Sequence, residues 1–149
     1  MSDKNKEFVN LDNARHNDQR AVMEEIAQNE ECPFCPEQLE KYHKQEILRK
    51  GAHWIITRNQ WPYEHTDLHL LAIAAYHVEH LDELREGSFD ELQGHLVWAT
   101  HEFNVEAGGF AMRFGDIKEN GATVRHLHAH LIIPSKERGP DDKVRFKIS

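Results

Sequence analysis

The seven residues from His126 to Ile132 alternate histidine with apolar side chains up to Leu131. Successive side chains of an extended strand point to opposite faces of a sheet. One face would therefore carry His126, His128 and His130, and the other Leu127, Ala129 and Leu131. Because the apolar face needs a core to pack against, this run predicts a strand at 127–133, ended by Pro134. Its neighbouring imidazoles would lie about 6.6 Å apart.

Strong β-formers and turn residues predict four more strands. They are expected at residues 53–57, 68–74, 110–114 and 144–148, the first two as antiparallel neighbours. The segment 115–123, between the strands expected at 110–114 and 127–133, is expected to be a loop.

Helical spacing of apolar residues predicts two helices. The first carries Met23 and Ile26 on one stripe and would be capped by Asp12 or Asn13. The second has the Ser-x-x-Glu form of a capping box at Ser88 and Glu91 and continues to Gly108. Strands that follow one another with helices inserted favour an α+β fold built on an antiparallel sheet. At 149 residues, one domain over 1–149 is expected, with 1–30 as an N-terminal helical extension.

The composition narrows the class of protein. The formal net charge is −8 and there is no basic run, which argues against a nucleic-acid partner. No apolar stretch approaches the roughly 20 residues of a membrane helix, so no membrane association is expected. The first residues, Met-Ser-Asp-Lys-Asn-Lys-Glu, do not resemble a secretory signal, and a cytoplasmic location is expected.

The histidine face of the 127–133 strand is the main candidate for chemistry, in a chain with 12 histidines. Burying several imidazoles without partners costs stability, so simple packing explains them poorly. A solvated His-rich face and a metal-binding array of all three remain alternatives. The third interpretation is catalytic, because an unprotonated imidazole is a competent nucleophile at neutral pH.

The pattern His-x-His-x-His followed by two apolar residues resembles the signature of the histidine triad superfamily, at all seven positions. The similarity extends over roughly Cys32 to Pro134. It implies the histidine triad fold and an attack by the middle histidine, His128, on an α-phosphorus to form a covalent nucleotidyl-histidine. It also implies that His130 binds the phosphate or protonates the leaving group.

The same resemblance suggests residues for binding the substrate. Asn59 matches a position that holds ribose hydroxyls, although a turn-forming asparagine is the equal alternative. The segment Gly121, Ala122 and Thr123 resembles one that holds the α-phosphate, with an ordinary turn as the alternative. A positive charge could come from Arg113, Lys118 or Arg125, each of which could equally be a surface side chain.

Cys32 and Cys35 form a C-x-x-C pair, which in a reducing compartment is more often a metal or redox device than a disulfide. Structural zinc takes four Cys or His ligands. The resemblance implies His77 and His126 as the other two, so that one triad histidine would serve the metal. Free thiols are the alternative, and His80 is a competing ligand. His16, His43 and His65 lie in polar stretches and are expected to face solvent.

The sequence therefore predicts a nucleotidyl hydrolase or transferase that acts on a purine nucleotide conjugate, such as a nucleoside phosphoramidate or a dinucleoside polyphosphate. The resemblance also implies a homodimer. The rival interpretation is a non-catalytic purine-nucleotide-binding module in which zinc only stabilises the fold.

Overall fold

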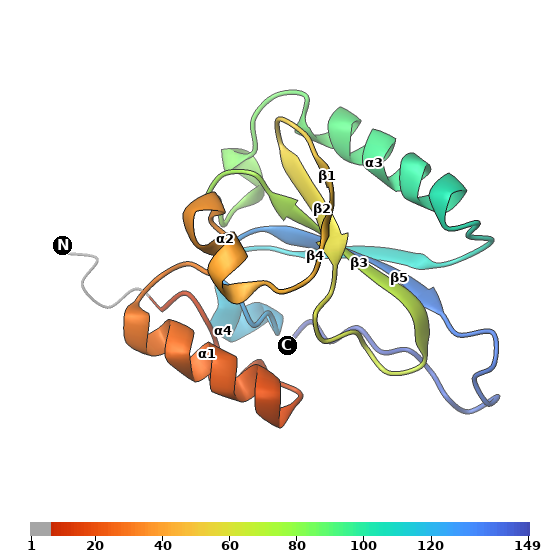
Figure 1. Cartoon of the computed structure of the whole chain (residues 1–149), viewed down its shortest axis with the longest axis horizontal. Coiled ribbons are helices and arrows are strands. Elements are labelled where there is room, and N and C mark those ends of the chain that lie inside the picture. Colours follow the sequence, from red (N-terminus) through yellow and green to blue (C-terminus); the bar gives the residue numbers. More distant parts are fainter. Residues whose placement is uncertain (1–6) are drawn as a thin grey trace.

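The computed structural model describes residues 7–149, so the first six residues of the expected N-terminal extension lie outside it. A five-stranded antiparallel sheet, in the order β1-β2-β3-β5-β4, forms the centre of the molecule (Figure 1). The strands are β1 (Ile47–Lys50), β2 (Trp54–Arg58), β3 (Thr66–Ala74), β4 (Gly109–Arg113) and β5 (His128–Pro134). The helices are η1 (Leu11–Asn13), α1 (Asn17–Asn29), α2 (Pro36–Tyr42), η2 (Leu81–Glu83), α3 (Ser88–Glu102) and α4 (Ile117–Asn120). The α+β fold class is confirmed.

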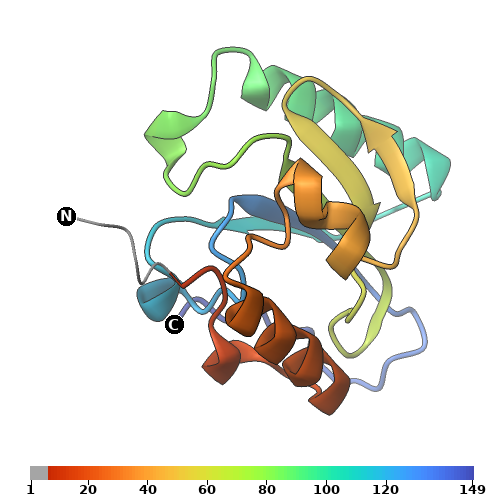
Figure 2. The same ribbon diagram turned by 60° about the vertical axis from the view of Figure 1, so that its left-hand side comes forward.

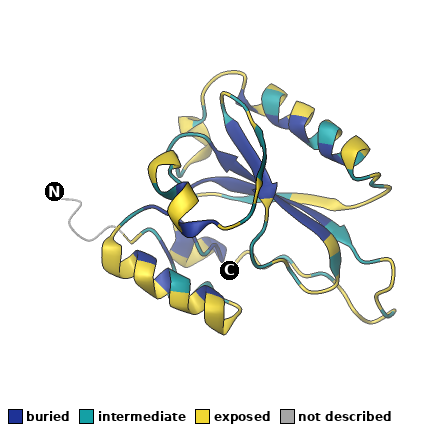
Figure 3. Ribbon diagram, in the orientation of Figure 1, coloured by how far each residue is buried: buried dark blue, intermediate teal, exposed yellow. Residues whose placement is uncertain are grey.

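The two faces of the sheet are covered by different helices. Leu127, Ala129 and Leu131 join the core cluster that packs against α3 through Leu92 and Ala99. On the opposite face, Leu71 and Ile73 pack with Leu39 of α2. Figures 1 and 2 show α1 and α3 on opposite sides of the sheet, and Figure 3 shows that the central strands are the most buried elements.

The register between β3 and β5 fixes which side chains share the second face. Leu71 lies opposite His130 and Ile73 lies opposite His128. Opposite residues of an antiparallel pair point to the same face. The two histidines therefore point away from the α3 core and toward the side of α1 and α2.

The N-terminal helix forms where the Met23 and Ile26 stripe predicts it, and both side chains are buried with Val9, Tyr42 and Val124. Its predicted cap is wrong. Asp12 and Asn13 belong to the separate short helix η1, and the residue before α1 is His16, whose side chain makes no capping hydrogen bond. None of the helices within residues 7–149 is long and apolar enough to cross a membrane.

Several elements differ from the sequence prediction. The strands β2, β3, β4 and β5 form within two residues of their expected bounds, and β2 and β3 are antiparallel neighbours as predicted. The helix α2, which begins at Pro36, the short helix α4 and the strand β1 were not expected. Residues 144–148 form no strand, because their backbone lies along the cavity wall, where the Lys147 carbonyl accepts from the Arg113 side chain.

The predicted capping box at Ser88 is also wrong. The residue before α3 is Gly87, in a left-handed conformation, and no side chain caps the helix. The Glu91 carboxylate instead accepts hydrogen bonds from the backbone amides of Ala52, His53 and Trp54, at 2.8 to 3.2 Å. Glu91 thus joins α3 to the turn between β1 and β2.

Replacing Glu91 should therefore weaken the fold more than a loss of charge alone. In Glu91→Gln an amide N–H group would face backbone donors, and we expect a loss of about 1–3 kcal/mol in the free energy of unfolding. The matched control is Asp90→Asn, in the same exposed first turn, with a loss below about 1 kcal/mol. Urea denaturation measures both, and equal losses would contradict the bridging role.

Candidate active site

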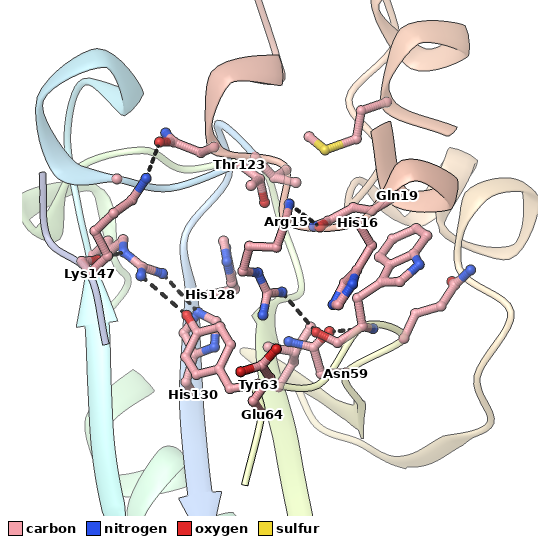
Figure 4. A pocket seen from close by; sticks show the side chains of 18 of the residues that line it. Arg15, His16, Gln19, Asn59, Tyr63, Glu64, Thr123, His128, His130 and Lys147 are labelled. Atoms are coloured by element: carbon pink, nitrogen blue, oxygen red, sulfur yellow. Dashed lines mark hydrogen bonds between the residues drawn. The ribbon is translucent and has the colours of Figure 1, made fainter. Parts of the chain in front are cut away.

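A cavity of about 500 Å³ opens on the histidine face of the sheet. Its floor includes His128 and His130 of β5, and its walls come from α1, from the segment 59–65 between β2 and β3, and from the C-terminal segment 141–147. Figure 4 shows Arg15, Asn59, Tyr63 and Lys147 around these two histidines. A cavity of this size suits a small organic ligand.

His128 is held as a neutral imidazole with a free lone pair. Its Nδ1–H donates to the carbonyl oxygen of His126 at 2.8 Å, so Nε2 carries no proton. Burial lowers the pKa of His128 to about 4, while this hydrogen bond acts in the opposite direction. The ring also packs edge-on against Phe34, with ring centres 5.0 Å apart. His128 is thus oriented and electronically suited to act as a nucleophile.

His130 is assigned the opposite tautomer from the two shortest contacts in its chain of partners. The Tyr63 backbone amide donates to Nδ1 of His69 at 3.1 Å, and a backbone amide cannot accept. The single proton of neutral His69 must therefore lie on Nε2, which donates to Nδ1 of His130 at 2.8 Å. This places the proton of His130 on Nε2. Two longer contacts, Arg113 Nη1 to His130 Nε2 at 3.4 Å and Asn59 Nδ2 to His69 Nε2 at 3.3 Å, favour the reverse tautomer, and the shorter contacts outweigh them. Burial, then the neighbouring His128, His69, Arg113 and Arg15, lowers the pKa of His130, which keeps it neutral.

Among the three candidate cations, the structure brings only Arg113 to the cavity. Its Nη1 lies 3.4 Å from Nε2 of His130. Arg125 instead pairs with Glu79 and Asp116, and Lys118 is exposed and does not line the cavity. Arg15 also lines the cavity, as do Lys143, Arg145 and Lys147 of the C-terminal segment. The sequence did not suggest Arg15, since it precedes α1 without any motif.

Three of the four residues expected to bind substrate line the cavity. Asn59 lines the cavity, its Oδ1 accepting from the Trp61 amide at 2.8 Å and its amide nitrogen facing the His69 ring. Gly121 and Thr123 also line it. Gly121 has φ +78°, and a Cβ there would lie 3.0 Å from the Lys147 carbonyl oxygen. Ala122 is buried, does not line the cavity, and donates its amide to the Asn120 side chain.

Cys32, Cys35, His77 and His126 form a second cluster, with all four potential ligand atoms within 4.8 Å of one another. Nδ1 of His126 lies 3.4 Å from Cys32 Sγ, 3.7 Å from Cys35 Sγ and 3.3 Å from His77 Nδ1. A tetrahedral zinc site with ordinary bond lengths has ligand–ligand separations of about 3.3–3.8 Å. The competing candidate His80 is not in this cluster.

The outer ring nitrogens of His77 and His126, which face away from the cluster, each donate a hydrogen bond. Nε2–H of His126 donates to the Ala74 carbonyl oxygen at 2.7 Å, and Nε2–H of His77 donates to the Glu79 carboxylate at 3.0 Å. The two Nδ1 atoms therefore face each other at 3.3 Å, and the contacts with Cys35 and Glu79 raise the pKa of His77. Such outer hydrogen bonds are typical of metal-bound histidines, whose inner nitrogens must lose any proton to bind the ion.

A hydrogen bond joins the two thiols. The hydrogen bond between the sulfur atoms lowers the pKa of Cys32 and raises that of Cys35 to about 11. Metal binding would require the second thiol to lose its proton as well. The donor set and its spacing thus fit a divalent metal ion.

Of the three histidines expected to face solvent, two are exposed and one is buried. His16 and His65 are exposed, although both line the cavity. His43 is buried, and its Nε2 lies 2.7 Å from the Thr57 hydroxyl. Burial also lowers the pKa of His43. The prediction for His43 was wrong because it ends the unexpected helix α2, which packs Leu39 and Tyr42 inward.

Comparison with known proteins identifies the fold. No protein-family model matches the sequence, and no curated protein does. Among solved structures, a zinc-bound histidine triad family protein from Mycobacterium smegmatis is 18% identical and aligns over 80% of this chain and 84% of its own, with a TM-score of 0.55. A histidine triad nucleotide-binding protein from Candida albicans, also 18% identical, aligns over 78% and 86%, with a TM-score of 0.58. This chain has the histidine triad fold.

A third similar structure is that of diadenosine triphosphate hydrolase from Plasmodium falciparum. It is 25% identical and aligns over 68% of this chain and 65% of its own, with a TM-score of 0.50. The resemblance of the His126–Ile132 run to the histidine triad signature is thus confirmed at the level of the fold.

The tautomers at the cavity can be measured directly. We expect nitrogen-15 NMR shifts at neutral pH to show His128 protonated on Nδ1 and His130 protonated on Nε2. In His69→Ala, His130 should lose its fixed tautomer while His128 keeps its own, because only His130 depends on His69. The exposed His101 serves as the internal control for an unconstrained ring. Identical tautomers at His128 and His130 would contradict the assignment.

Proposed function

We propose that this protein is a nucleotidyl hydrolase or transferase that acts on the α-phosphate of a nucleotide conjugate through a covalent intermediate on His128. The observation that carries the proposal is the pair of opposite tautomers in one cavity. His128 offers a lone pair on Nε2, and His130 offers a proton on Nε2. The ring centres are 5.1 Å apart, close enough for both to meet one phosphate group.

The proposed reaction has two steps. Nε2 of His128 attacks the α-phosphorus, the new P–N bond forms, and the bond to the leaving group breaks with its electron pair. His130 Nε2–H donates a hydrogen bond to a phosphate oxygen during this step. Water, or another acceptor, then attacks the phosphorus, the P–N bond breaks, and the proton of the water passes to solvent. His128 returns to its neutral form.

The rest of the cavity supports a nucleotide as substrate. Its side toward α1 is lined by apolar residues, including Met23, Ile26 and Phe34, where a purine base could pack. Asn59 stands at the cavity for ribose hydroxyls, and Gly121 and Thr123 for phosphate oxygens. The structural neighbours include a nucleotide-binding protein and a diadenosine triphosphate hydrolase, which supports the same substrate class.

We further propose that Cys32, Cys35, His77 and His126 hold a structural zinc ion. The spacing of the four donor atoms and the two Nδ1 atoms that face each other support this, and one neighbour is a zinc-bound protein. A zinc ion would supply a fixed cross-link and no reacting group, because all four ligand positions would be filled. His126 would then orient its own carbonyl, which accepts from His128.

Loss of His128 should abolish the covalent step. On brief mixing with a diadenosine polyphosphate or an AMP amide, intact-mass analysis should show an adenylylated chain, and AMP should be released. His128→Ala should show no adduct and lower turnover by about 10³-fold or more. The control His101→Ala, on the exposed side of α3, should behave as the unmodified protein.

Nucleotide binding without any adduct or released AMP would contradict the enzymatic function and support the binding-module interpretation. Retained turnover in His128→Ala would exclude His128 as the nucleophile.

Metal analysis tests the zinc site independently of turnover. The purified protein should contain about one zinc ion per chain. Cys32→Ala should lose the metal and should unfold at lower temperature, since metal binding is coupled to folding. His80→Ala should keep the metal, because His80 is not in the cluster. A metal-free native protein would refute this part of the proposal.

A further inference from the structure

Gln19 is a polar side chain within the apolar stripe of α1. Val22, Met23 and Ile26 follow it at helical spacing, so these residues share one face of the helix, and all of them line the cavity (Figure 4). Glutamine is usually a surface residue. Gln19 is nevertheless only 4% exposed, as little as the apolar Met23 and Ile26, at 3% and 4%. A polar group is therefore placed where the pattern of the helix calls for an apolar one.

A backbone contact fixes the orientation of the Gln19 amide group. The backbone N–H of Arg15 donates a hydrogen bond to Oε1 of Gln19 at 2.8 Å. Because a backbone N–H can only donate, the atom that it meets must be the carbonyl oxygen, and the oxygen and nitrogen of the amide cannot be exchanged. The NH₂ group is therefore the end of the side chain that is turned away from the Arg15 nitrogen.

This NH₂ group makes no hydrogen bond within residues 7–149. In the same part of the chain, the one side-chain nitrogen or oxygen that is fully buried without a partner is Nδ1 of His95. Nε2 of Gln19 is therefore not sealed inside the protein and reaches the cavity that the residue lines. A donor among apolar side chains is costly unless an acceptor meets it, so the occupant of the cavity has to supply one.

Gln19 lies beside the place proposed for the base. Met23, Ile26 and Phe34 line the apolar side of the cavity. Gln19 and Met23 are four residues apart, about 6 Å along the helix axis. The polar atoms of a base all lie on its edges, whereas its faces pack against apolar groups. The NH₂ group of Gln19 would therefore meet an edge of the base.

Adenine and guanine differ in what such an edge offers. Adenine presents the N7 acceptor beside its 6-amino donor, whereas guanine presents two adjacent acceptors, N7 and O6. A glutamine that uses its amide oxygen and NH₂ group together matches adenine. In Gln19 the oxygen already accepts from the Arg15 amide, and the NH₂ group can only donate. A donor that stands alone matches the 6-oxo group of guanine.

We propose that Gln19 is a specificity-determining residue that favours a 6-oxopurine base, guanine or hypoxanthine, over adenine. Its NH₂ group donates to O6 of the base while the Arg15 backbone holds the amide group in place. This inference rests on the proposed function and adds the identity of the base to it. No bond of the substrate changes at this position, so Gln19 affects selectivity alone, and adenosine compounds remain weaker ligands of the same cavity.

The test measures the binding of GMP, IMP and AMP by isothermal titration calorimetry and needs no turnover. We expect the Kd of GMP and of IMP to be about 10-fold lower than that of AMP. IMP isolates the contribution of O6, because it lacks the 2-amino group of guanine. In Gln19→Met, which keeps the length of the side chain without a donor, this preference should fall below about 2-fold.

Gln28→Met is the matched control, since it makes the same substitution at an exposed position of α1, and it should keep the preference of the unmodified protein. Circular dichroism should show that Gln19→Met stays folded, because methionine continues the apolar stripe.

Three outcomes would overturn the inference while leaving the covalent chemistry of His128 intact. These are equal affinities for GMP, IMP and AMP in the unmodified protein, an unchanged preference in Gln19→Met, and tight binding of GMP with IMP as weak as AMP. In the last case the 2-amino group, and not O6, would carry the preference. Binding of none of the three nucleotides would overturn both the inference and the nucleotide substrate of the proposed function.

Discussion

The pairing of β5 between β3 and β4 is the constraint on which the rest of the site depends. Its two-residue period sends Leu127, Ala129 and Leu131 into the α3 core and His128 and His130 into the cavity. A slip of one residue in the register would exchange these faces, burying imidazoles in the core. The register that buries the apolar face of β5 therefore also places His128 and His130 in the cavity.

Backbone groups determine the chemistry of the two histidines. The His126 carbonyl accepts a hydrogen bond from Nδ1–H of His128, and the Tyr63 amide, acting through His69, favours the proton of His130 on Nε2. The two rings are neutral and carry their protons at opposite positions, although they are identical side chains on one strand. His126 contributes in two ways, since its ring belongs to the Cys32 cluster while its carbonyl orients His128.

The sequence predicted what depends on local pattern and failed where distant contacts decide. Alternation predicted β5 and the shared face of His128 and His130, and the resemblance led to the Cys32, Cys35, His77 and His126 cluster, whose donors the fold brings together. The pattern of Ser88 and Glu91 was misleading because the Glu91 carboxylate accepts hydrogen bonds from backbone amides of the β1–β2 turn, which is far away in the sequence. No sequence pattern marked Arg15 or Tyr63 as a cavity residue. Their places at the cavity depend on contacts between segments that are far apart in the sequence, such as the stacking of Arg15 on the Tyr63 ring.

Segments near the two ends of the described chain complete the cavity around the histidines. Arg15 comes from the segment before α1, and the Lys147 carbonyl and the Phe146 ring hold Arg113 in place. The two ends also touch, because the Lys147 side chain donates to Asn13 at 2.7 Å. The proposed bond-forming groups thus lie on the central strand, whereas contacts with peripheral segments hold the Arg113 and Arg15 side chains beside them. The surroundings of the two histidines can therefore change through these segments while β5, with its buried apolar face, stays the same.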